Sequence, residues 1–220
     1  IPYLAKSFAY FLDRGVREVA VSPLVTHDPG WQLEMIDVLV EEVAAVLSIS
    51  LEHFGQTGEI PFVPFRTTEN DGSADADPPK MCSAARTDEI AVDVDGKIFP
   101  CVMLIDSYQA FPAGPLSAGL ENVHLGNIGD PEFERRLAEH PSKVSDARIF
   151  NNKQTKFSSY RRCEGCKYLR QCSICPVSIC YIPGNSDPNR VPDLPCALNL
   201  VLLAARERFL DHISASTALR

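Results

Sequence analysis

Apolar residues along the first 66 positions recur at helical and strand-like spacings. From Tyr3 to Arg14, and again from Trp31 to Leu51, they return every three or four positions, which predicts two amphipathic helices. Residues 16–25 and 60–65 are short apolar runs, and their prolines suit strand ends or edges. Helix, strand, helix and strand in succession predict an α/β layer with parallel strands. The strands are too few to complete a barrel or an open sheet, so this segment is expected to be the end of a larger fold.

A polar, acidic and proline-ended stretch, Thr67 to Lys80, interrupts this pattern and predicts a linker. After it, residues 89–93 alternate between apolar and polar, Asp95-Gly96 has the composition of a tight turn, and residues 97–101 are apolar again. This pattern predicts a β-hairpin, in which Gly96 supplies the positive φ that the turn requires. The hairpin is expected to bring Cys101 back near the level of Cys82.

The remaining pattern predicts one more strand and two helices. His124 to Ile128 is expected to be a short strand, and Asp130 with the following proline to start a helix that reaches about His140. Asp193 is expected to cap a final helix with Cys196 in its first turn and a buried face formed by Leu198, Leu202, Ala205, Phe209 and Ile213. Residues 105–121 are expected to be a loop, and residues 141–160 carry no clear signal.

Charge and composition narrow the class of protein. The formal net charge is −8, which argues against a general nucleic-acid binder because no broad basic face is available to neutralise phosphates. No apolar run approaches the roughly 18 residues that a membrane-spanning helix needs. The chain starts with Ile1 rather than Met and shows no leader, so we expect a cytoplasmic protein that is either processed or a fragment.

The candidate chemistry lies in eight cysteines. Six of them fall between residues 163 and 196, and two stand upstream, giving the set Cys82, Cys101, Cys163, Cys166, Cys172, Cys175, Cys180 and Cys196. Four thiolates suit one tetrahedral metal ion or one iron–sulfur cluster, so eight suggest two metal centres. Four disulfides are the alternative for a secreted protein, but C-x-x-C spacing and long amphipathic helices favour metal. The gap between Cys166 and Cys172 is short for a zinc ribbon, so the spacing favours a cluster and leaves zinc open.

These residues carry a resemblance. The hairpin Val-Asp-Val-Asp-Gly-Lys-Ile-Phe-Pro-Cys that ends at Cys101, the segment Leu125-Gly-Asn-Ile128, and the series Cys163-x-x-Cys166-x5-Cys172-x-x-Cys175-Pro followed by Cys196 resemble the SPASM domain of radical S-adenosylmethionine (SAM) enzymes. Enzymes of this family modify peptides and proteins, and anaerobic sulfatase maturases are among them. The resemblance implies three parts: an incomplete α/β radical SAM barrel over residues 1–66, a linker over 67–81, and an α+β SPASM domain over 82–216.

The resemblance also implies a ligand assignment. One auxiliary [4Fe–4S] cluster would be held by Cys163, Cys166, Cys172 and Cys196, here called set II. The other would be held by set I, which is Cys82, Cys101, Cys175 and Cys180. The C-x-x-C spacing at Cys172 and Cys175 departs from the C-x3-C common in the family, and Cys180 is an additional thiol whose alternative role is a free cysteine beside an open iron site. Nearby basic residues either offset the thiolate charge or form a solvated surface, and these are Arg161, Arg162, Lys167 and Arg170.

The family's C-x3-C-x-x-C motif is absent from this sequence. By the resemblance, that motif holds a third [4Fe–4S] cluster that binds and cleaves SAM, so this chain is not expected to be catalytic alone and no catalytic residue is assigned. The implied role is electron transfer or substrate positioning in a parent enzyme. The implied partners are a peptide or protein substrate and an electron donor such as flavodoxin or ferredoxin, with neither nucleic acid nor membrane. A zinc-stabilised module that binds protein is the alternative function.

Overall fold

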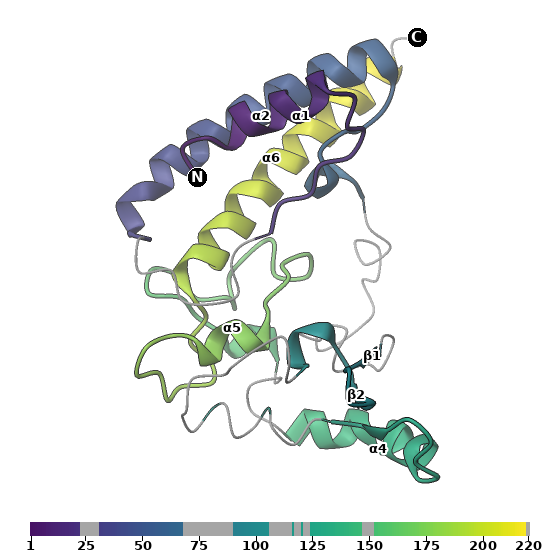
Figure 1. Cartoon of the computed structure of the whole chain (residues 1–220). Helices are drawn as coiled ribbons and strands as arrows, with labels where there is room; N and C mark the ends of the chain where they lie inside the picture. Colours follow the sequence, from purple (N-terminus) through teal and green to yellow (C-terminus); the bar gives the residue numbers. More distant parts are fainter. Residues whose placement is uncertain are drawn as a thin grey trace.

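The computed structural model describes residues 1–22, 31–67, 90–105, 116, 120, 124–146 and 152–218 (Figure 1). Its helices are α1 (Leu4–Asp13), α2 (Ile36–Thr57), α4 (Phe133–Asp146), α5 (Pro176–Cys180) and α6 (Asp193–Ala218). Its strands are β1 (Ala91–Val92), β2 (Lys97–Phe99) and β3 (Gly126–Asn127). Short 3-10 helices are η1 (Leu33–Met35), η2 (Val63–Phe65), η5 (Val102–Leu104) and η7 (Lys153–Thr155).

Helices α1, α2 and α6 lie side by side and share one apolar core (Figure 1). The predicted helices at residues 3–14 and 31–51 are confirmed, although α2 runs on to Thr57 and ends at Gly58 in the left-handed conformation, with φ of 75°. Aromatic rings fill the centre of this core: Phe209 of α6 stacks on Phe65 at 5.4 Å and meets Phe54 of α2 edge-on at 6.0 Å. Burial of these rings is what holds α6 against α2.

The two strands predicted in the first 66 residues do not form as strands. The described parts of these segments meet in one isolated parallel bridge between Val19 and Phe62. In it the N–H of Val19 donates to the carbonyl of Pro61, and the N–H of Val63 donates to the carbonyl of Val19. Residues 63–65 turn into η2 instead of extending. The physical reason is that Pro61 and Pro64 carry no N–H group and therefore cannot continue a ladder. The parallel arrangement was predicted correctly, but its extent was not.

The predicted hairpin is confirmed. Strands β1 and β2 pair antiparallel, with Ala91 opposite Phe99, and Gly96 turns between them with φ of 79°. Strand β3 adds to the other side of β2 and gives a three-stranded antiparallel sheet in the order β1-β2-β3. The strand predicted at residues 124–128 is thus present but shorter. Helix α4 starts three residues after Asp130, extends beyond the predicted end at His140, and lies beside β3.

A second apolar core lies under the sheet and the cysteine-rich loops. It is built from residues of β2, η5, α5 and the loop after η7, and six of the cysteines pack in it or against it: Cys101, Cys163, Cys172, Cys175, Cys180 and Cys196. Helix α6 takes part in both cores, because Cys196 lies in this one while Leu198 and Phe209 lie in the core of α1 and α2. Within the described residues, no helix has the length and hydropathy needed to cross a bilayer.

Candidate metal centre

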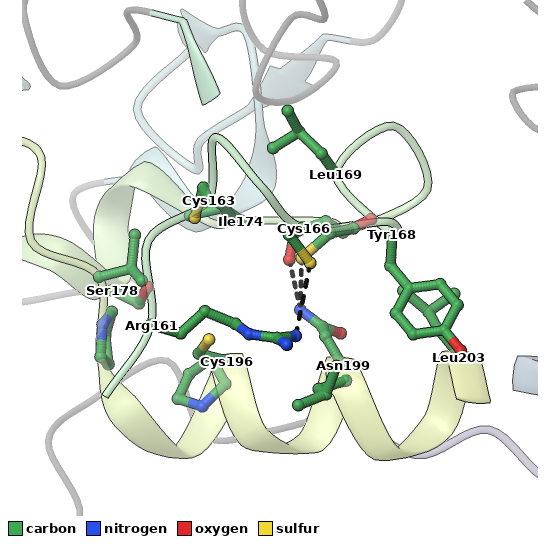
Figure 2. A pocket seen from close by; sticks show the side chains of 16 residues that line it. Arg161, Cys163, Cys166, Tyr168, Leu169, Ile174, Ser178, Cys196, Asn199 and Leu203 are labelled. Carbon is green, nitrogen blue, oxygen red and sulfur yellow. Dashed lines mark hydrogen bonds between the residues drawn. The ribbon is translucent and has the colours of Figure 1, made fainter. Parts of the chain in front are cut away.

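The four cysteines of set II line one cavity. Cys163, Cys166 and Cys172 come from the loop before α5, and Cys196 comes from the first turn of α6 on the opposite side (Figure 2). The cavity is partly open to solvent. Apolar side chains complete its wall, among them Ile174, Val191 and Leu203. The structure therefore brings together four thiols that lie up to 33 positions apart, from 163 to 196, in the sequence.

Short backbone turns shape the loop so that its thiols face the same space. The N–H of Cys166 donates to the carbonyl of Cys163 at 3.0 Å, which closes a turn over the first C-x-x-C segment. The N–H of Cys172 donates to the carbonyl of Tyr168 at 2.9 Å and closes the next turn. Such curled backbone is what lets the two sulfurs of a C-x-x-C segment converge.

The segment around Phe157 ties this loop to the approach to α6. Phe157 bridges Arg162 on one side in antiparallel fashion and Arg190 on the other in parallel fashion. The N–H of Cys163 donates to the carbonyl of Lys156 at 3.0 Å, and the N–H of Val191 donates to that of Phe157 at 2.8 Å. Two sides of the cavity are thereby held by one short stretch of backbone.

Two lysines are buried beside the cavity. Lys156 is 1% exposed and its Nζ donates to the carbonyl of Pro188 at 2.7 Å, while Lys153 is 5% exposed and its Nζ donates to the carbonyl of Cys172 at 2.7 Å. Burial lowers the pKa of Lys156 to about 8, and nearby Asp187 and Cys163 act in the opposite direction. Buried cations are costly unless they meet negative charge. Their position next to Cys163 and Cys172 places two cations where thiolates would gather.

Two further side chains donate directly to the sulfurs of set II. Arg161 Nη1 lies 3.7 Å from Cys166 Sγ, and Asn199 Nδ2 lies 3.6 Å from Cys172 Sγ (Figure 2). Figure 2 shows Arg161 between the loop that carries Cys166 and the helix that carries Cys196. Of the other basic residues expected to offset thiolate charge, Lys167 does not serve the sulfurs, because its Nζ lies 2.7 Å from a carboxylate oxygen of Glu207.

Two thiols of set II, those of Cys163 and Cys172, have raised pKa values and are therefore protonated at neutral pH when no metal is present. The pKa of Cys163 is raised to about 11 and that of Cys172 to about 12, chiefly by burial. The neighbouring thiols of set II contribute to both increases, whereas Lys153 acts in the opposite direction on Cys172. Burial also raises the pKa of the Tyr160 hydroxyl, which lies within hydrogen-bonding reach of Cys196. Close thiols that raise each other's pKa can all ionise only if a cation joins them.

Three cysteines of set I also lie near one another. Cys175 directly precedes the five-residue helix α5, Cys180 is the last residue of that helix, and Cys101 directly precedes η5. Burial raises the pKa of Cys180 to about 12, with Cys175 next in effect, and burial raises that of Cys175, with a smaller contribution from Cys101. Cys101 Sγ accepts from the N–H of Met103 at 3.4 Å. Cys82 lies outside the described residues, so the fourth member of the set is a prediction only.

The described cysteines form neither a disulfide nor a preformed site for a single metal ion. All seven described cysteines are free, so none of them forms a disulfide. In the described part of the chain, no three Cys, His, Asp or Glu side chains converge closely enough to bind one metal ion. A tetrahedral zinc site needs four ligands on one atom, with Zn–S distances of about 2.3 Å. The ligands of a [4Fe–4S] cluster bind four different irons and therefore stand farther apart around a shared space.

Comparison with known proteins places the fold. The solved structure of tagged anSMEcpe with bound AdoMet matches 96% of this chain with a TM-score of 0.56 and 15% sequence identity. This anaerobic sulfatase-maturating enzyme is a radical SAM enzyme. The fold is similar to part of that enzyme. The match covers 54% of the neighbour, so this chain spans about half its length. No protein-family model matches the sequence, and no curated protein matches it.

Sequence reasoning missed four residues of this site. Lys153, Lys156 and Tyr160 fall in the segment that carried no clear pattern, and a lysine pair there has the same appearance as a solvated surface. Asn199 gave a usable signal, because it follows Cys196 by three positions and therefore shares its face of a helix. A polar residue at that spacing from a ligand is a candidate donor to the metal site.

Proposed function

We propose that this chain is part of a radical SAM enzyme that modifies a peptide or protein, and that its cysteines hold two auxiliary [4Fe–4S] clusters. Set II, Cys163, Cys166, Cys172 and Cys196, would hold one of them, and set I, Cys82, Cys101, Cys175 and Cys180, the other. The observation that carries this proposal is the single cavity lined by all four thiols of set II. The fold shared with a radical SAM enzyme supports it.

Each cluster would supply one-electron chemistry when bound. The residues of this chain would hold the ligands in place, surround them with a largely apolar wall, and set cations near the thiolates. Lys153 and Lys156 would serve the last purpose, since both are buried beside Cys172 and Cys163, where four thiolates would bring negative charge. A peptide or protein substrate and a small one-electron donor such as a flavodoxin or ferredoxin are the expected partners of the parent enzyme.

The test is anaerobic reconstitution of the chain with iron and sulfide, followed by analysis of iron, sulfide and the absorption at about 400 nm. Two clusters correspond to about eight irons per chain. Cys196→Ala should lose the set II cluster and Cys175→Ala the set I cluster, and each variant should retain about four irons. The double variant should retain none.

Zinc is the competing outcome. A colourless protein that binds about two zinc ions and takes up no sulfide would contradict the cluster assignment and support a zinc-stabilised binding module. Retention of all iron by Cys196→Ala would contradict the ligand set even if clusters form. If the unsubstituted chain binds about four irons and Cys175→Ala binds the same number, set I holds no cluster and is removed from the proposal.

A further inference from the structure

The side-chain amide of Asn199 joins the two segments that carry set II. Its Nδ2 donates to the carbonyl of Ser173 at 2.8 Å and lies 3.6 Å from Cys172 Sγ (Figure 2). An amide nitrogen carries two hydrogens, so both bonds can form at once. Asn199 stands one turn along α6 from Cys196. Helix α6 therefore supplies the sulfur of Cys196 and, through Asn199, a hydrogen-bond donor to the sulfur of Cys172 on the facing loop.

Arg161 makes the corresponding contact on the loop. Its Nη1 lies 3.7 Å from Cys166 Sγ, and its carbonyl accepts from the backbone N–H of Ser158 at 2.8 Å, which fixes the backbone next to the side chain. An arginine keeps its positive charge over the whole range of working pH. Two of the four sulfurs in set II thus each have a donor, one neutral and one charged.

Donors of this kind act on the electron affinity of a cluster. A cluster ligated by thiolates becomes more negative by one charge when it is reduced, and hydrogen bonds to its sulfurs are one of the factors that set its reduction potential. A donor or a cation near the sulfurs stabilises the more negative, reduced state more than the oxidised state. Removing the donor should therefore make the cluster harder to reduce.

We propose that Asn199 and Arg161 are positioning residues that raise the reduction potential of the set II cluster through hydrogen bonds to Cys172 and Cys166. This inference rests on the proposed function, because it requires a cluster at set II. Its consequence is that set II accepts an electron more readily than its four thiolates alone would allow. Asn199 has the further effect of fixing the loop at Ser173, which keeps Cys172 facing Cys196.

The experiment uses the full chain carrying Cys175→Ala, in which only the set II cluster remains, and measures its midpoint potential by EPR-monitored redox titration. Asn199→Leu removes the donor without adding charge, and Asn199→Asp keeps the size but replaces the donor with a negative acceptor. Arg161→Met removes the charged donor. Lys167→Met is the matched control, because it removes one positive charge from the same loop at a side chain that bonds to Glu207 and not to sulfur.

Asn199→Leu should disfavour reduction about tenfold, which is a shift of about 59 mV to more negative potential for one electron. Arg161→Met should shift it in the same direction, Asn199→Asp should shift it further, and Lys167→Met should shift it much less. The inference would be overturned if both Asn199 variants and Arg161→Met had the same midpoint potential as the control Lys167→Met. Should Asn199→Leu fail to fold, the isosteric Asn199→Asp and the exposed Arg161→Met still decide it. Absence of iron from the Cys175→Ala background itself would instead contradict the proposed function.

Discussion

The carboxylate of Asp193 joins the start of α6 to the loop that carries Cys163. Its removal should show how much these hydrogen bonds contribute to stability and to iron binding at set II. The side-chain Oδ1 of Asp193 accepts from the backbone N–H of Ser159 at 2.8 Å, and Oδ2 accepts from the Ser159 hydroxyl at 2.8 Å. The backbone carbonyl of Asp193 accepts from the Tyr160 hydroxyl at 3.2 Å. Asp193 begins α6 three residues before Cys196, and Ser159 leads into the loop of Cys163. Asp193→Ala therefore removes one link between the two sides of the cavity without touching a thiol, while the backbone link through Phe157 remains.

The expected cost follows from the two side-chain bonds and the helix end. Hydrogen bonds to a charged group contribute roughly 1.5–3 kcal/mol each, and the lower end or less applies because Ser159 is exposed. A negative charge in the first turn of a helix adds about 0.3–1 kcal/mol. The sum is about 2–3 kcal/mol, which for a chain of this size lowers the melting temperature by roughly 4–12 °C.

The assay is urea or thermal unfolding of the reduced, metal-free chain, followed by iron analysis after reconstitution. Asp193→Ala should be destabilised and should retain less iron at set II, whereas Asp211→Ala, an exposed substitution farther along α6, should match the parent protein in both measurements. Asp193→Asn should lie between them, since its amide oxygen can still accept one bond. Equal stability and equal iron content for Asp193→Ala and Asp211→Ala would refute the idea that this contact holds the cavity closed.

Three further predictions test other parts of the molecule. In the metal-free chain, Lys156→Met should raise the unfolding free energy at pH 7 by up to about 3 kcal/mol, since the folded pKa near 8 lies below the ordinary 10.5. The unfolded chain binds the extra proton between these values, so the stability of the parent protein rises with pH across that window and the advantage of the variant shrinks, which urea titrations at pH 7 and pH 9.5 would show. Phe209→Ala should cost about 3–5 kcal/mol in thermal unfolding because the ring is fully buried between Phe65 and Phe54, and Phe209→Leu should cost clearly less. Gly126→Ala should cost about 1–3 kcal/mol, since φ is 124° and a Cβ would lie 3.0 Å from a carboxylate oxygen of Asp130, whereas Gly129→Ala, at φ of 79° with no close neighbour, should lose only the smaller backbone contribution.

The elements that local chemistry determines were predicted well. The hairpin depends on alternation and on the positive φ of Gly96, both of which are properties of a few adjacent residues. The final helix depends on its long apolar face, and it begins where it was predicted to begin, although Asp193 is its first residue and its carboxylate bonds to Ser159. The strand predicted around Val19 depends instead on neighbouring strands. With one bridge to Phe62 as its described pairing, the apolar run does not become an extended ladder.

The cysteines of the candidate site were predicted, whereas the side chains that support them were not. The resemblance to the SPASM domain implied the grouping of Cys163, Cys166, Cys172 and Cys196, and the structure places these four residues around one cavity. The supporting side chains could not be predicted, because the roles of Lys153 and Lys156 come from burial and not from their neighbours in sequence. A lysine next to other polar residues has the pattern of a surface until the fold covers it.

Helix α6 carries a consequence for any attempt to study the two parts of the chain in isolation. A shortened polypeptide beginning after residue 81 would retain Cys196 but would expose the side chains of Leu198, Leu202 and Phe209 in the core that α6 shares with α2 and η2. Such a truncated protein should self-associate through the exposed apolar face of α6, and its poor solubility could be mistaken for an inability to bind iron. Isotope labelling, limited proteolysis and crystallisation trials are therefore best designed on a polypeptide that retains both ends of this shared helical scaffold.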